Sequence, residues 1–175
     1  MYPYLRYLKL VLDAKKRAPL DITEESVLPM RVWPGDVDMF MELNNGRHMT
    51  LMDLGRFDLA ARSGFLKVTR ERDWGFAAAG ASIRFRYRIK FMERFNLRTR
   101  LIGLDSRWFY FEQRTEVKGK ICSSALVRGA VVSRNGAVPI EESLSAIGRR
   151  GLELPLPDWV KRWAEADSLR PWPED

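Results

Sequence analysis

After residue 82 the hydrophobic pattern of this 175-residue chain repeats every two residues, and this repeat constrains the fold more than any other feature. From residue 83 to 91, apolar side chains alternate with cationic ones, which predicts a strand with one apolar and one cationic face. Three more strands are predicted over residues 95–105, 107–117 and 121–133. The pair Asn135-Gly136 is a strong hairpin signal. Short connections between consecutive strands imply an antiparallel sheet.

One long helix precedes these four strands. A strand at about 27–33 leads through a turn at 34–46 into a helix at about 46–62, which ends at a Ser63-Gly64 cap. The helix is apolar on most sides, so we expect it to be buried on most sides by a sheet that curls around it. One helix against one curved antiparallel sheet is an α+β layer arrangement.

Composition excludes several classes of site. The chain carries one cysteine, Cys122, and one histidine, His48, which argues against a disulfide framework, a structural zinc site or a Cys-His nucleophile pair. We therefore expect no metal and no cofactor, and a single cysteine fits a reducing, cytoplasmic location. The net charge of +7 favours anionic partners without choosing among them.

Both ends of the chain are expected to add helices to the central domain. Leu5, Leu8 and Leu12 share one face of a short basic N-terminal helix. The favoured interpretation is a helix packed on the domain surface, and the alternative is a helix that makes weak contact with a membrane surface. The apolar run is far shorter than the ~20 residues of a membrane span. The predicted regions are a basic helix and linker at 1–25, the main domain at 26–150 and a Pro/Trp-rich helical tail at 151–175.

Two charged residues of the long helix break its apolar face. Asp53 and Arg56 lie within the apolar sector, whereas Asp58 and Arg62 are expected to form an ordinary exposed pair. A buried charge must be paired or it costs several kcal/mol. Asp53 and Arg56 could therefore pair with each other or with a neighbouring subunit. Alternatively, Asp53 faces a site cavity and Arg56 sets its protonation.

The turn before the helix carries the most informative motif. It reads Asp36-Val37-Asp38, then Asn44-Asn45-Gly46-Arg47, and the helix continues with Met52-Asp53-Leu54-Gly55-Arg56. With the helix and the four strands that follow, this pattern over residues 26–140 resembles the hot-dog fold. It is most similar to the acyl-CoA thioesterase superfamily typified by hydroxybenzoyl-CoA thioesterase.

The resemblance implies a long helix wrapped by a five-stranded antiparallel sheet. It also implies that two subunits pair through their sheets, as a homodimer or a dimer of dimers, with active sites at the interface. Asp38 corresponds to the catalytic carboxylate, and backbone groups around Gly46, Arg47 and His48 would hold the thioester carbonyl. The chain departs from the family pattern at Glu42, where a His is frequent, and at His48, where a Tyr is frequent.

Thioester hydrolysis needs a base or nucleophile and a group that stabilises the oxyanion. Asp38 can serve as general base or attack directly, with Asp53 as its rival. Free N–H groups at a helix start are natural oxyanion donors, and Asn45 could orient water or cap the helix. For Asp36 we favour turn chemistry, as we do cap chemistry for Asn44. His48 is interpreted as structural, or alternatively as a hydrogen-bond partner of the substrate.

Coenzyme A carries three phosphate groups, and a row of cations on two predicted strands could meet them. The row comprises Arg84, Arg86, Arg88 and Lys90, with Arg98 and Arg100 on the next strand. The alternative is a solvated outer sheet face, partly neutralised across strands by Glu112 and Glu116.

The leading hypothesis is an enzyme that hydrolyses an acyl-CoA thioester. The alternative is a module that binds acyl-CoA or acyl-carrier protein without cleaving it. Nucleic-acid binding through the cationic strand is a third possibility, but no sequence motif supports it.

Overall fold

The computed structural model describes residues 2–171 and places one long helix inside a curled antiparallel sheet. The strand order is β1-β3-β4-β5-β2, with the short strand β6 beside β5. The helices are α1 (Tyr4–Ala14), α2 (Asn45–Arg62), α3 (Phe65–Glu71), α4 (Ile140–Ala146) and α5 (Asp158–Ser168), and a 3-10 turn η1 spans Pro34–Asp36. The strands are β1 (Ser26–Arg31), β2 (Gly75–Phe85), β3 (Arg94–Leu104), β4 (Phe109–Val117), β5 (Lys120–Ser133) and β6 (Gly136–Ala137).

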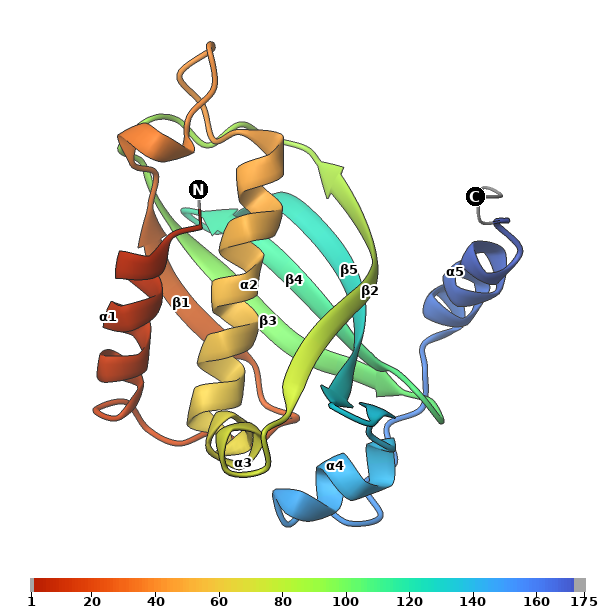
Figure 1. Cartoon of the computed structure of the whole chain (residues 1–175). Helices are drawn as coiled ribbons and strands as arrows, with labels where there is room; N and C mark the ends of the chain where they lie inside the picture. Colours follow the sequence, from red (N-terminus) through yellow and green to blue (C-terminus); the bar gives the residue numbers. More distant parts are fainter. Residues whose placement is uncertain (1, 172–175) are drawn as a thin grey trace.

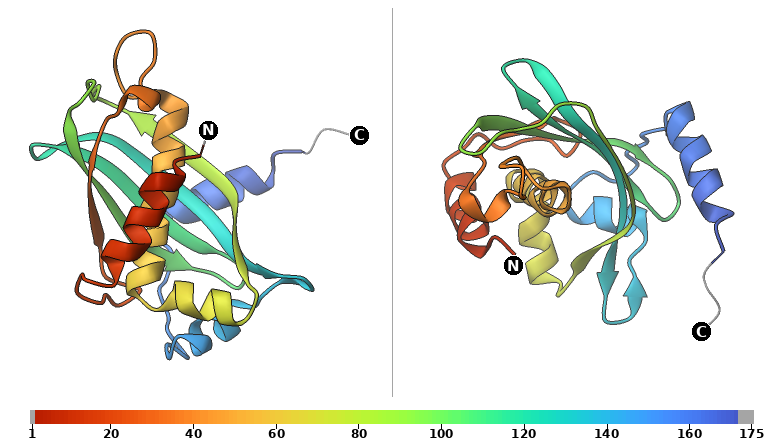
Figure 2. Two further views of the ribbon diagram at one scale, coloured as in Figure 1. Left: turned by 60° about the vertical axis from the view of Figure 1, so that its left-hand side comes forward. Right: turned by 90° about the horizontal axis from the view of Figure 1, so that it is seen from above.

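The concave side of the sheet holds α2 (Figure 1). Seen from above, the sheet curls around α2 on one side, while α1 closes the other (Figure 2). Near the middle of α2, Gly55 lies so close to the sheet that any Cβ there would collide with Thr99 of β3. These features confirm the expected α+β hot-dog architecture, and β6 adds one short strand to the five expected.

The tail helix α5 covers the outer, convex side of the sheet (Figure 2). Val160 is fully buried there with Tyr110 and Leu126. Arg128 of β5 stacks against Trp163 and donates to Asp167 at 2.8 Å, which fixes the helix on the sheet. Tyr110 therefore packs outward, as the alternation along its strand predicts.

The alternating segment at 83–91 was wrongly predicted to be one strand. β2 ends at Phe85, because the amides of Arg86 and Tyr87 both donate to the single carbonyl of Cys122. The strand instead begins at Gly75, in an alanine-rich stretch whose side chains are exposed. Phe76 and Ile83 of this edge strand pack against the core, but the alanines between them are exposed, so the sequence carries little apolar alternation.

The face of α2 that holds Asp58 was also wrongly predicted to be exposed. Asp58 is fully buried, and its carboxylate accepts hydrogen bonds from Arg17 at 2.6 Å and Ser26 at 2.5 Å. Arg62 adds an ion pair at 3.5 Å. The segment that joins α1 to β1 passes over this face of α2. The helical periodicity of α2 alone does not show that another segment buries this face.

The two edges of the sheet differ. At β1, Arg6 donates to the carbonyl of Arg31 at 3.1 Å and Arg17 to that of Val27 at 2.7 Å, while Pro29 between them has no N–H. The outer edge of β2 has no such cover among the described residues. Charged caps and proline are common ways to close a sheet edge, so β1 is closed and β2 is open.

Helix α1 packs on α2, but not through the face expected. Leu10 and Ala14 are its buried residues, whereas Leu5, Leu8 and Leu12 are exposed. Within residues 2–171, no helix has the length and apolar character that crossing a membrane requires.

Candidate active site

The loop between η1 and α2 projects at the top of Figure 1. Asp38 begins the turn in this loop, since its amide donates to the carbonyl of Glu42 and its carbonyl accepts the amide of Met41. Val37 and Leu43 pair across the loop, and Asp38 Oδ1 accepts the amide of Phe40 at 2.9 Å. Met41 adopts a positive φ of 57°, which closes the turn. Asp38 is half-buried and makes no ion pair within the described part of the chain. Its second carboxylate oxygen is therefore available to a water or a substrate.

Asp36 anchors this loop instead of facing a substrate. Its carboxylate is 2% exposed and binds Arg6 at 2.6 Å and Arg47 at 2.9 Å. It also accepts the amide of Trp33 at 2.9 Å, and its carbonyl accepts that of Asn44. The turn role favoured for Asp36 is confirmed, and two arginines occupy both of its oxygens.

Asn44 caps α2, as expected. Its Oδ1 accepts the amides of Gly46 at 2.9 Å and Arg47 at 3.3 Å, and its carbonyl accepts the amide of His48 at 3.1 Å. The three amides expected to hold a thioester carbonyl therefore already have acceptors. In the first turn of α2, among the described residues, only the Asn45 amide has none, and the Asn45 side chain is exposed.

His48 is buried directly behind this helix start. Its Nδ1 lies 3.2 Å from Ser123 Oγ, and Ser123 is in turn 2.7 Å from Thr115 Oγ1. The ring meets Phe85 edge to face at 5.1 Å. Desolvation lowers the pKa of His48 to about 4, so the imidazole is neutral at pH 7. The structural interpretation of His48 is supported by its burial, and sequence reasoning missed Ser123 and Phe85 because both come from distant strands.

Asp53 and Arg56 pair with each other, the first of the interpretations offered for them. Arg56 also donates to Gln113 of β4, whose amide nitrogen bonds to Thr99 and to the carbonyl of Met52 at 2.8 Å each. Burial raises the pKa of Asp53, and the charge of Arg56 opposes that shift. Asp53 lies eight residues beyond Asn45, about 12 Å along the helix. It belongs to a different region from the Asp38 loop.

The cations of the predicted row differ in their partners, and Arg88 pairs with Glu42 at 3.7 Å. Arg98 and Arg100 pair with Glu116 and Glu112, each at 2.7 Å, so the neutralised outer face is confirmed for them. Arg84 and Arg86 lie on either side of Phe85, whose ring meets His48, and they are exposed without an ion pair within residues 2–171. The contact of Phe85 with His48 brings this end of β2 beside the start of α2, while Arg84, next to Phe85 in the strand, points to the other face.

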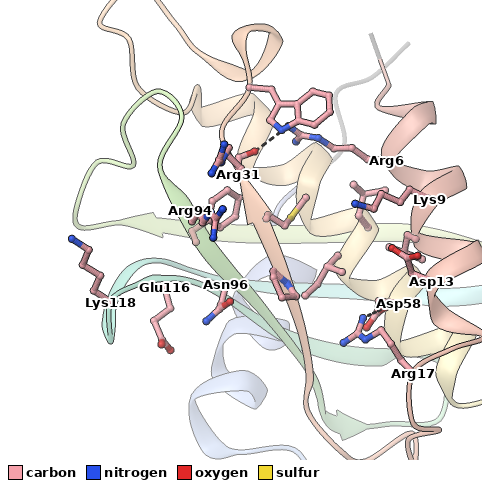
Figure 3. Close-up of a pocket in the computed structure, with 17 residues that line it drawn as sticks. Arg6, Lys9, Asp13, Arg17, Arg31, Asp58, Arg94, Asn96, Glu116 and Lys118 are labelled. Carbon is pink, nitrogen blue, oxygen red and sulfur yellow. Dashed lines mark hydrogen bonds and ion pairs between the residues drawn. The ribbon is translucent and has the colours of Figure 1, made fainter.

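A cavity lies away from these residues. A groove of about 890 Å³ runs along β1 beside α1 (Figure 3). Lys9 and Asp13 line one side, and Arg31, Arg94 and Lys118 lie across β1. None of the residues predicted to be catalytic lines this groove. Nor does any group of three His, Cys, Asp or Glu residues suited to a metal occur in the described ranges.

Comparison with known proteins gives a consistent assignment. A model of the thioesterase-like superfamily matches residues 32–164. Protein THEM6 of Xenopus laevis is 30% identical over 145 residues, which cover 82% of this chain and 69% of the frog protein.

Solved structures share the fold. A hypothetical protein, TT1821 from Thermus thermophilus, superposes with a TM-score of 0.65 at 25% identity and covers 74% of this chain and 100% of its own. The BH1999 gentisyl-coenzyme A thioesterase gives a TM-score of 0.63 at 20% identity, with 69% and 99% covered.

Proposed function

The chain belongs to the thioesterase-like superfamily, and from this premise we propose that it hydrolyses an acyl-CoA thioester to the free acid and coenzyme A. The observation that carries the proposal is the carboxylate of Asp38. It lies in the loop that leads into α2 and makes no ion pair among the described residues. Both carboxylate oxygens of the neighbouring Asp36, by contrast, are paired with arginines. One carboxylate with an oxygen free to accept a proton, placed before a helix start, is the minimum that water activation requires.

In the proposed reaction, Asp38 takes a proton from water as the water oxygen attacks the thioester carbonyl. The tetrahedral oxyanion then collapses, the C–S bond breaks and the proton passes to the departing thiolate. General base catalysis of this kind contributes about 10²–10⁴-fold in rate. The alternative is direct attack by Asp38, which forms a mixed anhydride that water then cleaves.

The groups that would stabilise the oxyanion form the less complete part of the site. The Asn45 amide is the available donor in the first turn, because Asn44 occupies those of Gly46 and Arg47. The exposed side chain of Asn45 is suited to orient the attacking water. A carbonyl could reach the Gly46 and Arg47 amides only if it displaced the Asn44 side chain.

Substrate recognition is proposed at the end of β2. Arg84 and Arg86 are exposed and would meet the phosphates of coenzyme A. The open edge of β2 supports pairing of two chains through this strand, which would bring the partner's copy of the site close by. We propose a homodimer built in this way, as the hot-dog resemblance implies.

The test is release of free thiol from purified protein with a panel of aliphatic and aromatic acyl-CoAs. Asp38→Asn should lower kcat by at least about 100-fold. Asp53→Asn is the matched control, because it removes the same charge from the rival helix site. If Asp38→Asn keeps the wild-type rate and Asp53→Asn does not, the helix carboxylate is the base.

A binding module without hydrolysis is the second candidate. The occupied helix amides and the departures at Glu42 and His48 favour it. Tight acyl-CoA binding in calorimetry, with no thiol released from any member of the panel, would establish this function instead.

A further inference from the structure

The outward face of α1 presents a stripe of large apolar side chains to solvent. Tyr4, Leu5, Leu8 and Leu12 are 69%, 79%, 57% and 55% exposed. They recur at helical spacing, so they lie together on one side of the helix. Isolated exposed leucines are ordinary, but a contiguous apolar stripe on a helix marks an interaction surface.

The helix cannot bury this stripe by rolling over. Arg6 bridges Asp36 at 2.6 Å and the carbonyl of Arg31 at 3.1 Å. Arg17, just past the other end of the helix, bridges Asp58 and the carbonyl of Val27. With Leu10 already buried on the opposite face, the stripe is held outward.

The charges around the stripe are of one sign. Lys9, Lys15 and Lys16 are exposed and make no ion pair within the described residues. Asp13 is the only acidic residue between positions 2 and 20, and it lines the groove beside β1 together with Lys9 (Figure 3). The helix therefore carries lysines at the border of the stripe and just past its end, and one carboxylate on the side of the groove.

We propose that this face of α1 docks the protein on the surface of an anionic lipid bilayer. The apolar stripe would enter the boundary between headgroups and acyl chains, and the lysine stems would lie along it with their ammonium groups at the phosphates. Each lysine near an anionic surface strengthens binding by about five-fold. The proposal does not depend on the proposed hydrolysis.

A second exposed apolar cluster fits an anionic bilayer less well. Met39 and Phe40, at the tip of the loop before α2, are also exposed, but this loop is flanked by the carboxylates of Asp38 and Glu42. Anionic lipids would repel Asp38, which has no ion pair within residues 2–171, whereas Glu42 is paired with Arg88 at 3.7 Å. Charge complementarity therefore selects α1 over the loop.

Co-sedimentation of the full chain with vesicles tests the proposal, with phosphatidylcholine alone or mixed with one-third phosphatidylserine. We expect binding to the mixed vesicles that weakens in high salt. The double variant Leu5→Glu/Leu8→Glu should lose at least about ten-fold in affinity. The triple variant Lys9→Gln/Lys15→Gln/Lys16→Gln should lose about a hundred-fold on mixed vesicles and little on neutral ones.

Leu169→Glu is the matched control, since Leu169 is 83% exposed just past the end of α5, on the far side of the sheet. Circular dichroism and thermal unfolding verify that each variant is folded. The proposal is overturned if the α1 variants bind like the wild type, or if Leu169→Glu or Phe40→Glu weakens binding as much. It is also overturned if no vesicle binds and gel filtration shows self-association that Leu5→Glu/Leu8→Glu removes, because the face would then bind a second copy.

Discussion

Arg17 and Asp58, 41 residues apart in the sequence, form a 2.6 Å ion pair that joins the segment after α1 to the buried side of α2. The same carboxylate accepts the Ser26 hydroxyl, and the same guanidinium donates to the carbonyl of Val27. One contact thus holds α1, β1 and α2 together.

Asp58→Asn should therefore be strongly destabilising. Asparagine carries no charge, so Arg17 and Arg62 would lose the carboxylate that they share beneath the segment joining α1 to β1. Breaking a buried ion pair in this way costs about 3–5 kcal/mol. Urea unfolding followed by circular dichroism measures the loss. Glu71→Gln is the comparison, because its pair with Lys67 is exposed and should be worth less than about 1 kcal/mol. Equal losses in the two variants would contradict this account of Asp58.

Gly55→Ala should lower the free energy of unfolding by about 1–3 kcal/mol through overpacking. The added methyl would collide with Thr99 Oγ1 and approach Leu97 Cδ2 to 2.9 Å and Gln113 Nε2 to 3.0 Å. Gly35→Ala is the control, since its Cβ would meet no atom within 4 Å. Thermal unfolding of the two variants compares them. A Gly55→Ala protein as stable as the wild type would mean that α2 can shift away from β3.

Acid should weaken the fold through His48. Its pKa is about 4 in the folded protein and 6.5 ordinarily, so between these values the unfolded chain binds a proton that the folded one does not. Above pH 6.5 the ring is neutral in both states, so the free energy of unfolding is not reduced. It falls by about 3 kcal/mol as the pH drops from 6.5 to 4. His48 is the only histidine, so His48→Gln should remove this part of the pH dependence. Urea unfolding at a series of pH values checks it, and an unchanged slope in the variant would refute it.

Removal of Arg84 and Arg86 should weaken substrate binding more than catalysis. Arg84→Ala/Arg86→Ala should raise KM for an acyl-CoA by about 10-fold or more with kcat little changed, because phosphate contacts far from the carbonyl are made equally in ground and transition states. A thioester of N-acetylcysteamine lacks the phosphates and should show no effect. Arg100→Ala is the control, since Arg100 is paired with Glu112 on the outer face. A similar loss with both thioesters would assign the arginines a structural role.

Local signals were enough to predict much of this molecule. The start of α2 at Asn45 and its Ser63-Gly64 end follow from capping chemistry, and the three strands β3 to β5 follow from their alternation. The turn role of Asp36 and the cap role of Asn44 are likewise set by residues within a few positions.

What failed depends on contacts across the fold. Asp58 is buried because residues near Arg17 and Ser26 cover it, and nothing beside it in the sequence encodes that cover. Ser123 reaches His48 only because β5 lies behind α2. The start of β2 was missed because most side chains of its alanine-rich stretch are exposed, which leaves only a weak apolar alternation.

The arginine caps on β1 also determine how far the sheet can grow. Strands can be added only where backbone groups are unpaired, and of the two end strands of the described sheet, β1 and β2, that condition holds at β2. When two chains pair through β2, the open edge of each chain is covered by the other. The β1 edges, which are closed, then lie at both ends of the combined sheet. Such an assembly is finite by construction, so the same interaction that would build a pair cannot propagate into a fibre.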